Sequence, residues 1–204
     1  MTVLPALDVY RMIKAGELVI EPFELREELT PPASIDLRVS ARTVKYSFQN
    51  DEYLIGERIE EDEGLTEDLV GNIYSLDPGN GAIFILYEKI ILPPTLAAIV
   101  LPRSSLTRLG VGLQPTYLNP GYQGNCPVLL TNHATFTVKI PFREGIGPRL
   151  AQVLFLKLGS LPHRKYGEGL DEKYQDELGI PARFDRDVDI VQLLEPLRQA
   201  LDKI

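Results

Sequence analysis

Two short segments carry the residues best suited to chemistry. Residues 102–106 (PRSSL) join a guanidinium to two hydroxyl groups after an apolar run, and residues 118–124 (LNPGYQG) form a turn-rich loop. A guanidinium fork, hydroxyl donors and the free N–H groups at a helix start can together bind phosphate oxygens. We therefore expect Ser104 or Ser105 to cap a short helix that Gly110 ends. Taken alone, the first segment is either an anion site or an ordinary capped turn with a surface arginine, and the second is the commoner case.

Two further polar positions interrupt apolar runs. Asp36 lies inside the alternating run 34–39, where an unpaired carboxylate would be costly, so we expect it to have a structural partner. Gln152 follows Arg149 at the start of another apolar run. Its amide could bind an amide-bearing base or a neighbouring backbone group, and the sequence leaves both roles open.

The net charge of the chain limits the classes of partner that it can bind. Twenty-nine acidic residues against 21 basic ones give a net charge of -8, which argues against nucleic acid or an anionic membrane as the main partner. The longest apolar runs, such as residues 90–92, are far too short to span a bilayer, and the chain opens without a signal-peptide pattern. We expect a cytoplasmic protein.

Cysteine and histidine are scarce. Cys126 is the single cysteine, which excludes an intrachain disulfide and a thiolate metal cluster within one chain. The zinc-dependent base deaminases need a His-x-Glu and a Pro-Cys-x-x-Cys pattern, and both are absent, so we expect no zinc. Cys126 is expected to be a small core residue on a strand rather than a nucleophile.

The apolar pattern predicts a mostly β fold between two helices. Residues 6–16 and 188–204 have helical periodicity, with Gly16 ending the first helix and Pro196 bending the second. Between them, short β-branched and aromatic runs are separated by proline and glycine, at 18–20, 34–39, 43–48, 73–75, 82–92, 97–101, 128–132, 135–140 and 151–158. The acidic stretch 51–68 is expected to be a solvated loop. We expect a β domain over 1–187 and an appended amphipathic helix over 188–204.

The order of these motifs resembles the dCTP deaminase and dUTPase family over nearly the whole chain. The opening 8–23 followed by 34–38 (SIDLR) resembles the deaminase branch, because the simpler dUTPases lack that N-terminal helix. The remaining matches are the phosphate motif 103–110 (RSSLTRLG), the sugar and base loop 119–124 (NPGYQG), the strand start 149–152 (RLAQ), and a C-terminal lid with Lys173, Tyr174 and Gly179.

The resemblance implies a distorted jelly-roll (dUTPase-like) β fold and a homotrimer with sites at the subunit interfaces. It implies a deoxynucleoside triphosphate ligand, with Mg²⁺ bound through the triphosphate and no metal site made by the protein. The implied binding residues are Arg103, Ser104 and Ser105 for the triphosphate, Asn119, Tyr122 and Gln152 around the sugar and base, and Lys173 and Tyr174 from the lid.

Two positions depart from the family pattern. The family has an acid at the position of Asn119, and the deaminases have a proton-transferring glutamate nine residues after the motif proline, where this chain has Leu129. An amide cannot take a proton at neutral pH, and leucine has none to move. The catalytic residues are therefore unassigned, and residues 125–135 contain no Asp or Glu in any register. In the lid, Glu177 replaces a usual glutamine.

Three functions remain open. The main hypothesis is a dCTP deaminase, which converts dCTP and water to dUTP and ammonia, with Glu144 or Asp176 as replacement acids that the spacing does not single out. The alternative is a catalytically inactive trimer that binds a deoxynucleotide or serves as a scaffold. A dUTP diphosphatase ranks third.

Overall fold

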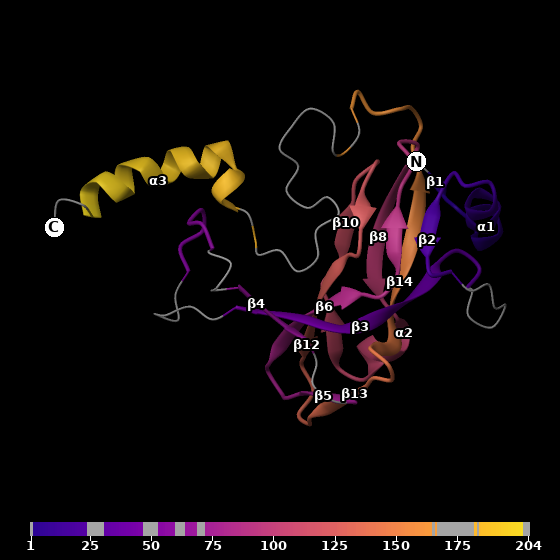
Figure 1. The fold of residues 1–204 in the computed structure, drawn as a ribbon, viewed down its shortest axis with the longest axis horizontal. Helices are drawn as coiled ribbons and strands as arrows, with labels where there is room; N and C mark the ends of the chain where they lie inside the picture. Colours follow the sequence, from indigo (N-terminus) through magenta and orange to yellow (C-terminus); the bar gives the residue numbers. More distant parts are fainter. Residues whose placement is uncertain are drawn as a thin grey trace.

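The computed structural model describes residues 2–23, 31–46, 53–59, 64–68, 72–164, 166, 182 and 184–201 of the 204-residue chain. They form a mostly β structure with few helices, as the sequence predicts (Figure 1). The helices are α1 (Ala6–Lys14), α2 (Ser104–Arg108), the 3-10 turn η2 (Phe184–Arg186) and α3 (Val188–Leu201). The strands are β1 (Thr2–Val3), β2 (Val19–Glu21), β3 (Ile35–Tyr46), β4 (Gly64–Asp68), β5 (Ile73–Leu76), β6 (Gly81–Leu86), β7 (Lys89–Ile91), β8 (Leu96–Pro102), β9 (Val111–Leu113), β10 (Thr116–Leu118), β11 (Gln123–Gly124), β12 (Pro127–Asn132), β13 (Val138–Pro141) and β14 (Ile146–Lys157).

The N-terminal helix confirms its prediction. Helix α1 buries Ala6 and Val9, and its first and last turns hold Asp8 and Lys14, the charges that a helix dipole favours at those ends. Ala15 is the C-cap, and Gly16 follows with φ of +71°. That left-handed conformation is available to glycine without a Cβ penalty, so the helix ends where the sequence predicts.

In the described part of the chain, nine strands pair in one curled sheet. Its path runs β10-β8-β14-β3-β6-β12-β9, with β1 attached to β14 and β4 attached to β3. Strand β14 pairs with β8 along one edge and with β3 along the other. Two smaller sheets, β11-β7-β2 and β13-β5, complete the strand pairing. The ends of β3 and β8 are therefore both positioned by β14.

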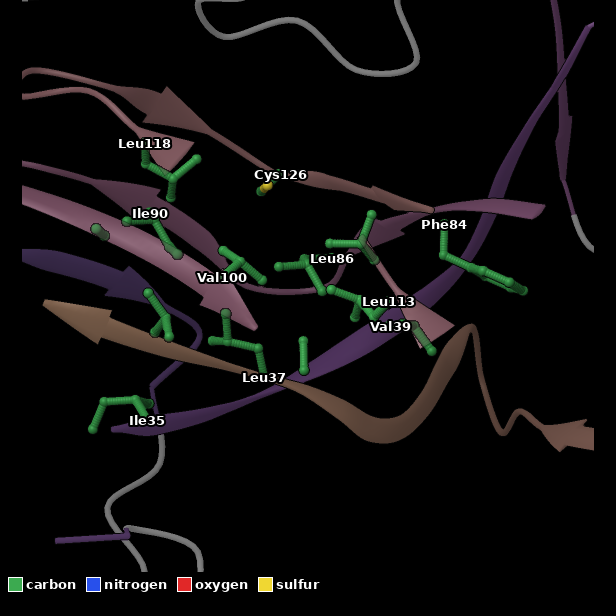
Figure 2. Packing of buried hydrophobic residues seen from close by; sticks show 14 of the residues in the cluster. Ile35, Leu37, Val39, Phe84, Leu86, Ile90, Val100, Leu113, Leu118 and Cys126 are labelled. Atoms are coloured by element: carbon green, nitrogen blue, oxygen red, sulfur yellow. The ribbon is translucent and has the colours of Figure 1, made fainter. Parts of the chain in front are cut away.

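The core lies on one side of this sheet. On β3, Ile35, Leu37 and Val39 are buried at every second position, as a half-buried strand requires. Figure 2 shows Leu37 with Leu86 of β6 and Val100 of β8 in the same interior. The residues between them on β3, Asp36 and Arg38, point to the opposite face. Alternation on β3 thus separates an apolar core from a polar face.

Several predicted strand boundaries differ from the structure. The runs 34–39 and 43–48 are not two strands: residues 35–46 form one strand, β3, because a register irregularity between Val39 and Thr43 carries the chain through without a turn. Residues 47 and 48 lie outside the described residues. The run 82–92 is two strands, since Tyr87 and Glu88 interrupt the ladder. The short strands β1, β9, β10 and β11 were too short to give a periodic pattern.

Part of the acidic stretch is a strand rather than a loop. Residues 64–68 form β4, which pairs with residues 42–46 of β3. Strand β6 occupies one edge of β3 at this point, and β14 occupies the other edge only as far as Ser40. Strand β4 therefore takes the edge that β14 leaves unpaired, and backbone pairing outweighs the low β-propensity of its acids.

The C-terminal helix lies at the opposite end of the molecule from α1 (Figure 1). It begins at Val188, as predicted, and Pro196 lies inside it. Leu194 is 4% exposed, whereas Val188 is 71% exposed. The helix packs on residues 53–59: a Cβ built on Gly56 would lie 2.5 Å from atoms of both Ile190 and Leu194.

We expect Gly56→Ala to loosen α3 from residues 53–59, because the added methyl displaces Ile190 and Leu194 and the φ of +103° strains any side chain. Amide hydrogen exchange should show faster exchange across α3. Gly79→Ala is the matched control, since Gly79 has φ of +77° with nothing within 4 Å of an added Cβ. Equal exchange of α3 in both variants would show that the helix does not depend on this contact.

Candidate functional site

Arg103, and not a serine, begins the short helix of the phosphate motif. It is the N-cap of α2 with extended dihedrals, φ −72° and ψ 143°, and no side chain caps the helix. The prediction that Ser104 or Ser105 caps α2 is therefore wrong. The reason is that the N–H of Arg103 still donates to the carbonyl of Leu150 on β14 at 3.0 Å, which keeps Arg103 extended and makes the serines the first two helical residues.

This placement leaves the serines turned outward. Both Ser104 and Ser105 are exposed, and the backbone N–H groups of Leu106 and Thr107 donate to the carbonyl of Arg103. The N–H groups of the two serines come before the first intrahelical bonds, so they are the orphan donors of the helix start. Hydroxyl and N–H groups of adjacent residues, next to a guanidinium, can donate hydrogen bonds to the oxygens of an anion.

The guanidinium of Arg103 is held by an acid from another strand. Its Nε lies 3.0 Å from Oδ2 of Asp36, and Nη1 of Arg149 lies 3.3 Å from the same oxygen. Nη1 of Arg103 also donates to the carbonyl of Arg149 at 3.2 Å. Asp36 is 4% exposed, while the two arginine side chains are 35% and 29% exposed. The expected structural partner of Asp36 is thus the phosphate-motif arginine itself, together with Arg149.

The carboxyl of Asp36 experiences opposed influences. Burial raises its pKa above the ordinary value, and the positive charges of Arg103 and Arg149 oppose that rise. The effect of burial on this pKa is larger than the effect of the two positive charges, because the side chain of Asp36 is almost fully covered. The arginines therefore do more than neutralise Asp36, since they also cover it.

Gln152 is bonded at both ends of its amide. Its Nε2 donates to the carbonyl of Pro102 at 2.9 Å, and its Oε1 accepts from the hydroxyl of Ser34 at 3.0 Å. Of the two roles open at the sequence level, the structure shows the bond to a neighbouring backbone. Gln152 thereby ties the end of β8, one residue before Arg103, to the residue that precedes β3.

The sugar and base loop is a tight turn. The N–H of Tyr122 donates to the carbonyl of Asn119 at 3.0 Å, with Pro120 and Gly121 between them. Proline at the second position and a glycine with φ of +88° at the third are the features of a type II turn. Asn119 itself is exposed and directly follows β10. Its amide is therefore presented at the rim of the loop.

Tyr122 lies in the core rather than on the surface. It is 8% exposed, and its ring centroid is 6.4 Å from that of Tyr166. The N–H of Tyr166 donates to the carbonyl of Pro120 at 2.7 Å. Tyr166, which follows β14, is thus hydrogen-bonded to the loop of residues 119–124. Lys173, Tyr174, Glu177, Gly179 and the replacement candidate Asp176 lie outside the described residues.

Leu129 occupies the position at which the family pattern predicts a glutamate. It lies on β12 opposite Ile83 of β6, and both side chains are partly buried, on the face opposite the buried Val128 and Leu130. Glu144, the other replacement candidate, is 83% exposed in the turn before β14, with φ of +55°.

A buried ion pair that the motifs did not reveal lies beside the loop. Oε1 of Glu88 lies 2.7 Å from Nε of Arg38, and Oε2 accepts from the N–H of Arg38 at 2.8 Å. Burial raises the pKa of Glu88, and the bonds from Arg38 oppose that rise. Asn125, just after the loop, donates to the carbonyls of Leu86 and Tyr87. Both carboxylate oxygens are engaged, so Glu88 acts as a structural anchor.

The two key motifs lie at opposite ends of one strand pair. On β10, Leu118 pairs with Ala98 of β8, so Asn119 follows at the level of Ala97. Arg103 follows the other end of β8, six residues after Ala97. Six residues of an extended strand span about 20 Å. Within a single chain, the side chains of Arg103 and Asn119 therefore cannot contact the same group.

Cys126 is not part of the candidate site. Cys126 is fully buried, lies one residue before β12 rather than on a strand, and has a pKa raised by burial to about 12. Its core role is confirmed, and a thiolate nucleophile is excluded. Among the residues that the structure describes, no three His, Cys, Asp or Glu side chains group together as metal ligands, and no helix has the length and apolar character of a membrane span.

Comparison with known proteins shows the family of this chain. The family model described as dCTP deaminase-like matches residues 3–158. A dCTP deaminase of Halorubrum lacusprofundi is 32% identical over 88% of this chain and 89% of its own, and a dUMP-forming dCTP deaminase of Halobacterium salinarum is 33% identical over 88% and 93%. The crystal structure of a 2'-deoxycytidine 5'-triphosphate deaminase from Agrobacterium tumefaciens superposes with a TM-score of 0.54 at 20% identity, over 75% of this chain and 47% of that one. The chain belongs to the dCTP deaminase-like family.

Proposed function

We propose that this protein binds a pyrimidine deoxynucleoside triphosphate and deaminates dCTP, converting dCTP and water to dUTP and ammonia. The observation that carries the proposal is the oriented guanidinium of Arg103 beside the exposed donors of Ser104 and Ser105, in a chain whose relatives are named dCTP deaminase. Three phosphate groups need several such donors, and Mg²⁺ would bind through their oxygens.

The roles of the other residues follow from their positions. Asn119 is exposed at the rim of the loop and would hydrogen-bond the sugar or base. Tyr122 would form the apolar floor beneath the deoxyribose, and Gln152 would support the phosphate segment through the carbonyl of Pro102. Lys173 and Tyr174 would close over the phosphates. A cytoplasmic location belongs to the same proposal, because the substrate is a free nucleotide.

The site would be shared between subunits of a homotrimer. The separation of about 20 Å between Arg103 and Asn119 along β8 supports this, because one chain cannot bring both side chains to one nucleotide's adjacent groups. In a closed symmetric ring, each interface is equivalent, so Arg103 of one subunit and Asn119 of the next would form three identical sites.

A second candidate function is binding without turnover. It is favoured by Asn119 and Leu129, which replace the two proton-handling acids of the family. General acid–base catalysis typically supplies roughly 10²–10⁴-fold in rate, so the reaction of the natural chain would be slower by that order. Nucleotide binding alone would still depend on the same phosphate donors.

We expect dCTP with Mg²⁺ to raise the melting temperature by roughly 5 °C or more at saturating ligand, since a ligand at one hundred times its Kd stabilises by about 2.7 kcal/mol. Arg103→Ala should abolish the shift. Arg143→Ala, at a side chain 93% exposed, is the matched control and should keep it. If no deoxynucleoside triphosphate shifts the natural protein, the proposed function fails.

Turnover should respond to restored acids. We expect Asn119→Asp with Leu129→Glu to raise the rate of ammonia release from dCTP by about 10²-fold or more, because the pair regains proton transfer. Asn119→Asp with Leu129→Gln is the control, since glutamine has the same size without the acid. Products are resolved as dUTP, or as dUMP with pyrophosphate. Equal rates in the two double variants would show that these positions do not limit the chemistry, and nucleotide binding without product in the natural chain would favour the second function.

Mixed oligomers test the shared site. Arg103→Ala and Asn119→Ala should each weaken dCTP binding in homo-oligomers. Random mixing of the two chains should restore about a quarter of the natural sites, because a quarter of interfaces pair the two intact surfaces. Isothermal titration gives the fraction of restored sites. No restoration in mixed oligomers of confirmed composition would show that Arg103 of one subunit and Asn119 of the next do not form one site.

A further inference from the structure

Three charged side chains from three elements meet at the phosphate segment. Asp36 comes from β3, Arg149 from β14, and Arg103 from the junction of β8 and α2. A single oxygen, Oδ2 of Asp36, contacts both arginines, at 3.0 and 3.3 Å. The carboxylate is almost fully covered, whereas about a third of each arginine side chain is exposed. Asp36 is thus the buried centre of the cluster, and the arginines form its outer surface.

The contacts fix the plane of the Arg103 guanidinium. Its Nε is paired with Asp36, and its Nη1 donates to the carbonyl of Arg149. Two bonds to a planar group define its orientation, and neither of these two contacts uses Nη2. An unrestrained arginine loses rotamer entropy when a ligand orders it. Here much of that ordering is complete before any ligand arrives.

A carboxylate at this place has an electrostatic disadvantage. A negative charge within 3.0 Å of a phosphate-binding guanidinium weakens the attraction for a polyanion. Arg149 offsets it, since two arginines against one aspartate leave the cluster with one net positive charge. Orientation and charge therefore have opposite effects on binding, and an experiment can separate them.

We propose that Asp36 is a positioning residue for triphosphate binding: it holds the guanidinium of Arg103 oriented toward the phosphates, while Arg149 balances its charge. The inference rests on the proposed function of the Arg103 segment and deepens it. If orientation dominates, removing the negative charge of Asp36 weakens polyanion binding. If charge dominates, the same change strengthens it.

The experiment measures binding of inorganic tripolyphosphate, and separately of dCTP, to the full-length chain by titration calorimetry. Asp36→Asn is expected to weaken tripolyphosphate binding by about tenfold or more, because Arg103 loses the charged half of its anchor. Asp8→Asn is the matched control, since Asp8 forms an ion pair with Arg11 at 3.0 Å on the surface of α1. It should leave binding unchanged.

A double-mutant cycle shows whether Asp36 acts through Arg103. In an Arg103→Lys background, where the fork is already lost, Asp36→Asn should have little further effect. Asp36→Glu keeps the charge but shifts the carboxylate, so it should also weaken binding, and it covers the case in which Asp36→Asn fails to fold. Circular dichroism checks that each variant is folded.

Three results would overturn the inference: equal or tighter tripolyphosphate binding by Asp36→Asn and Asp36→Glu, additive losses in the cycle, or no tripolyphosphate binding by the natural chain. The proposed function fails separately. If the natural chain binds tripolyphosphate and Asp36→Asn weakens that binding, but no deoxynucleoside triphosphate binds, then the positioning role stands and the nucleotide assignment does not.

Discussion

The ion pairs of Asp36 with Arg103 and Arg149 are the constraint on which the site depends. They join β3, β14 and the start of α2, and the buried carboxylate can be tolerated only while both arginines stay in place. Gln152 adds a second connection between the same elements, through Pro102 and Ser34. The phosphate motif, residues 103–110, is therefore held by the sheet and does not behave as an independent loop.

The sheet also separates the two polar segments that the sequence singles out. Arg103 and Asn119 follow opposite ends of the β8–β10 pair, so their side chains are far apart within one chain. Elsewhere in the described structure, both carboxylate oxygens of the buried Glu88 are engaged by Arg38. Glu88 is thus a structural acid, and Leu129 lies on β12 opposite Ile83 of β6.

Sequence reasoning predicted what local patterns determine. The mostly β class, the helix ending at Gly16, the C-terminal helix and the family all follow from periodicity, turn residues and motif order. It was wrong where long-range pairing decides: β4 forms because β3 has a free edge, and Arg103 displaces the serines as N-cap because Leu150 binds its backbone. Asp36 was recognised as needing a partner, but its partners lie far along the chain and leave no local trace.

The long β3–β14 pairing also bears on how the chain folds. Asp36 and Arg149 are 113 residues apart, so the loop between them must close before the central ladder can form. During synthesis, the edge of β3 that pairs with β14 stays unpaired until β14 has left the ribosome. Folding dominated by such distant contacts is slow, and the phosphate segment is among the last parts to be completed. Premature termination before residue 157 would therefore release a chain with unpaired strands and a strong tendency to aggregate.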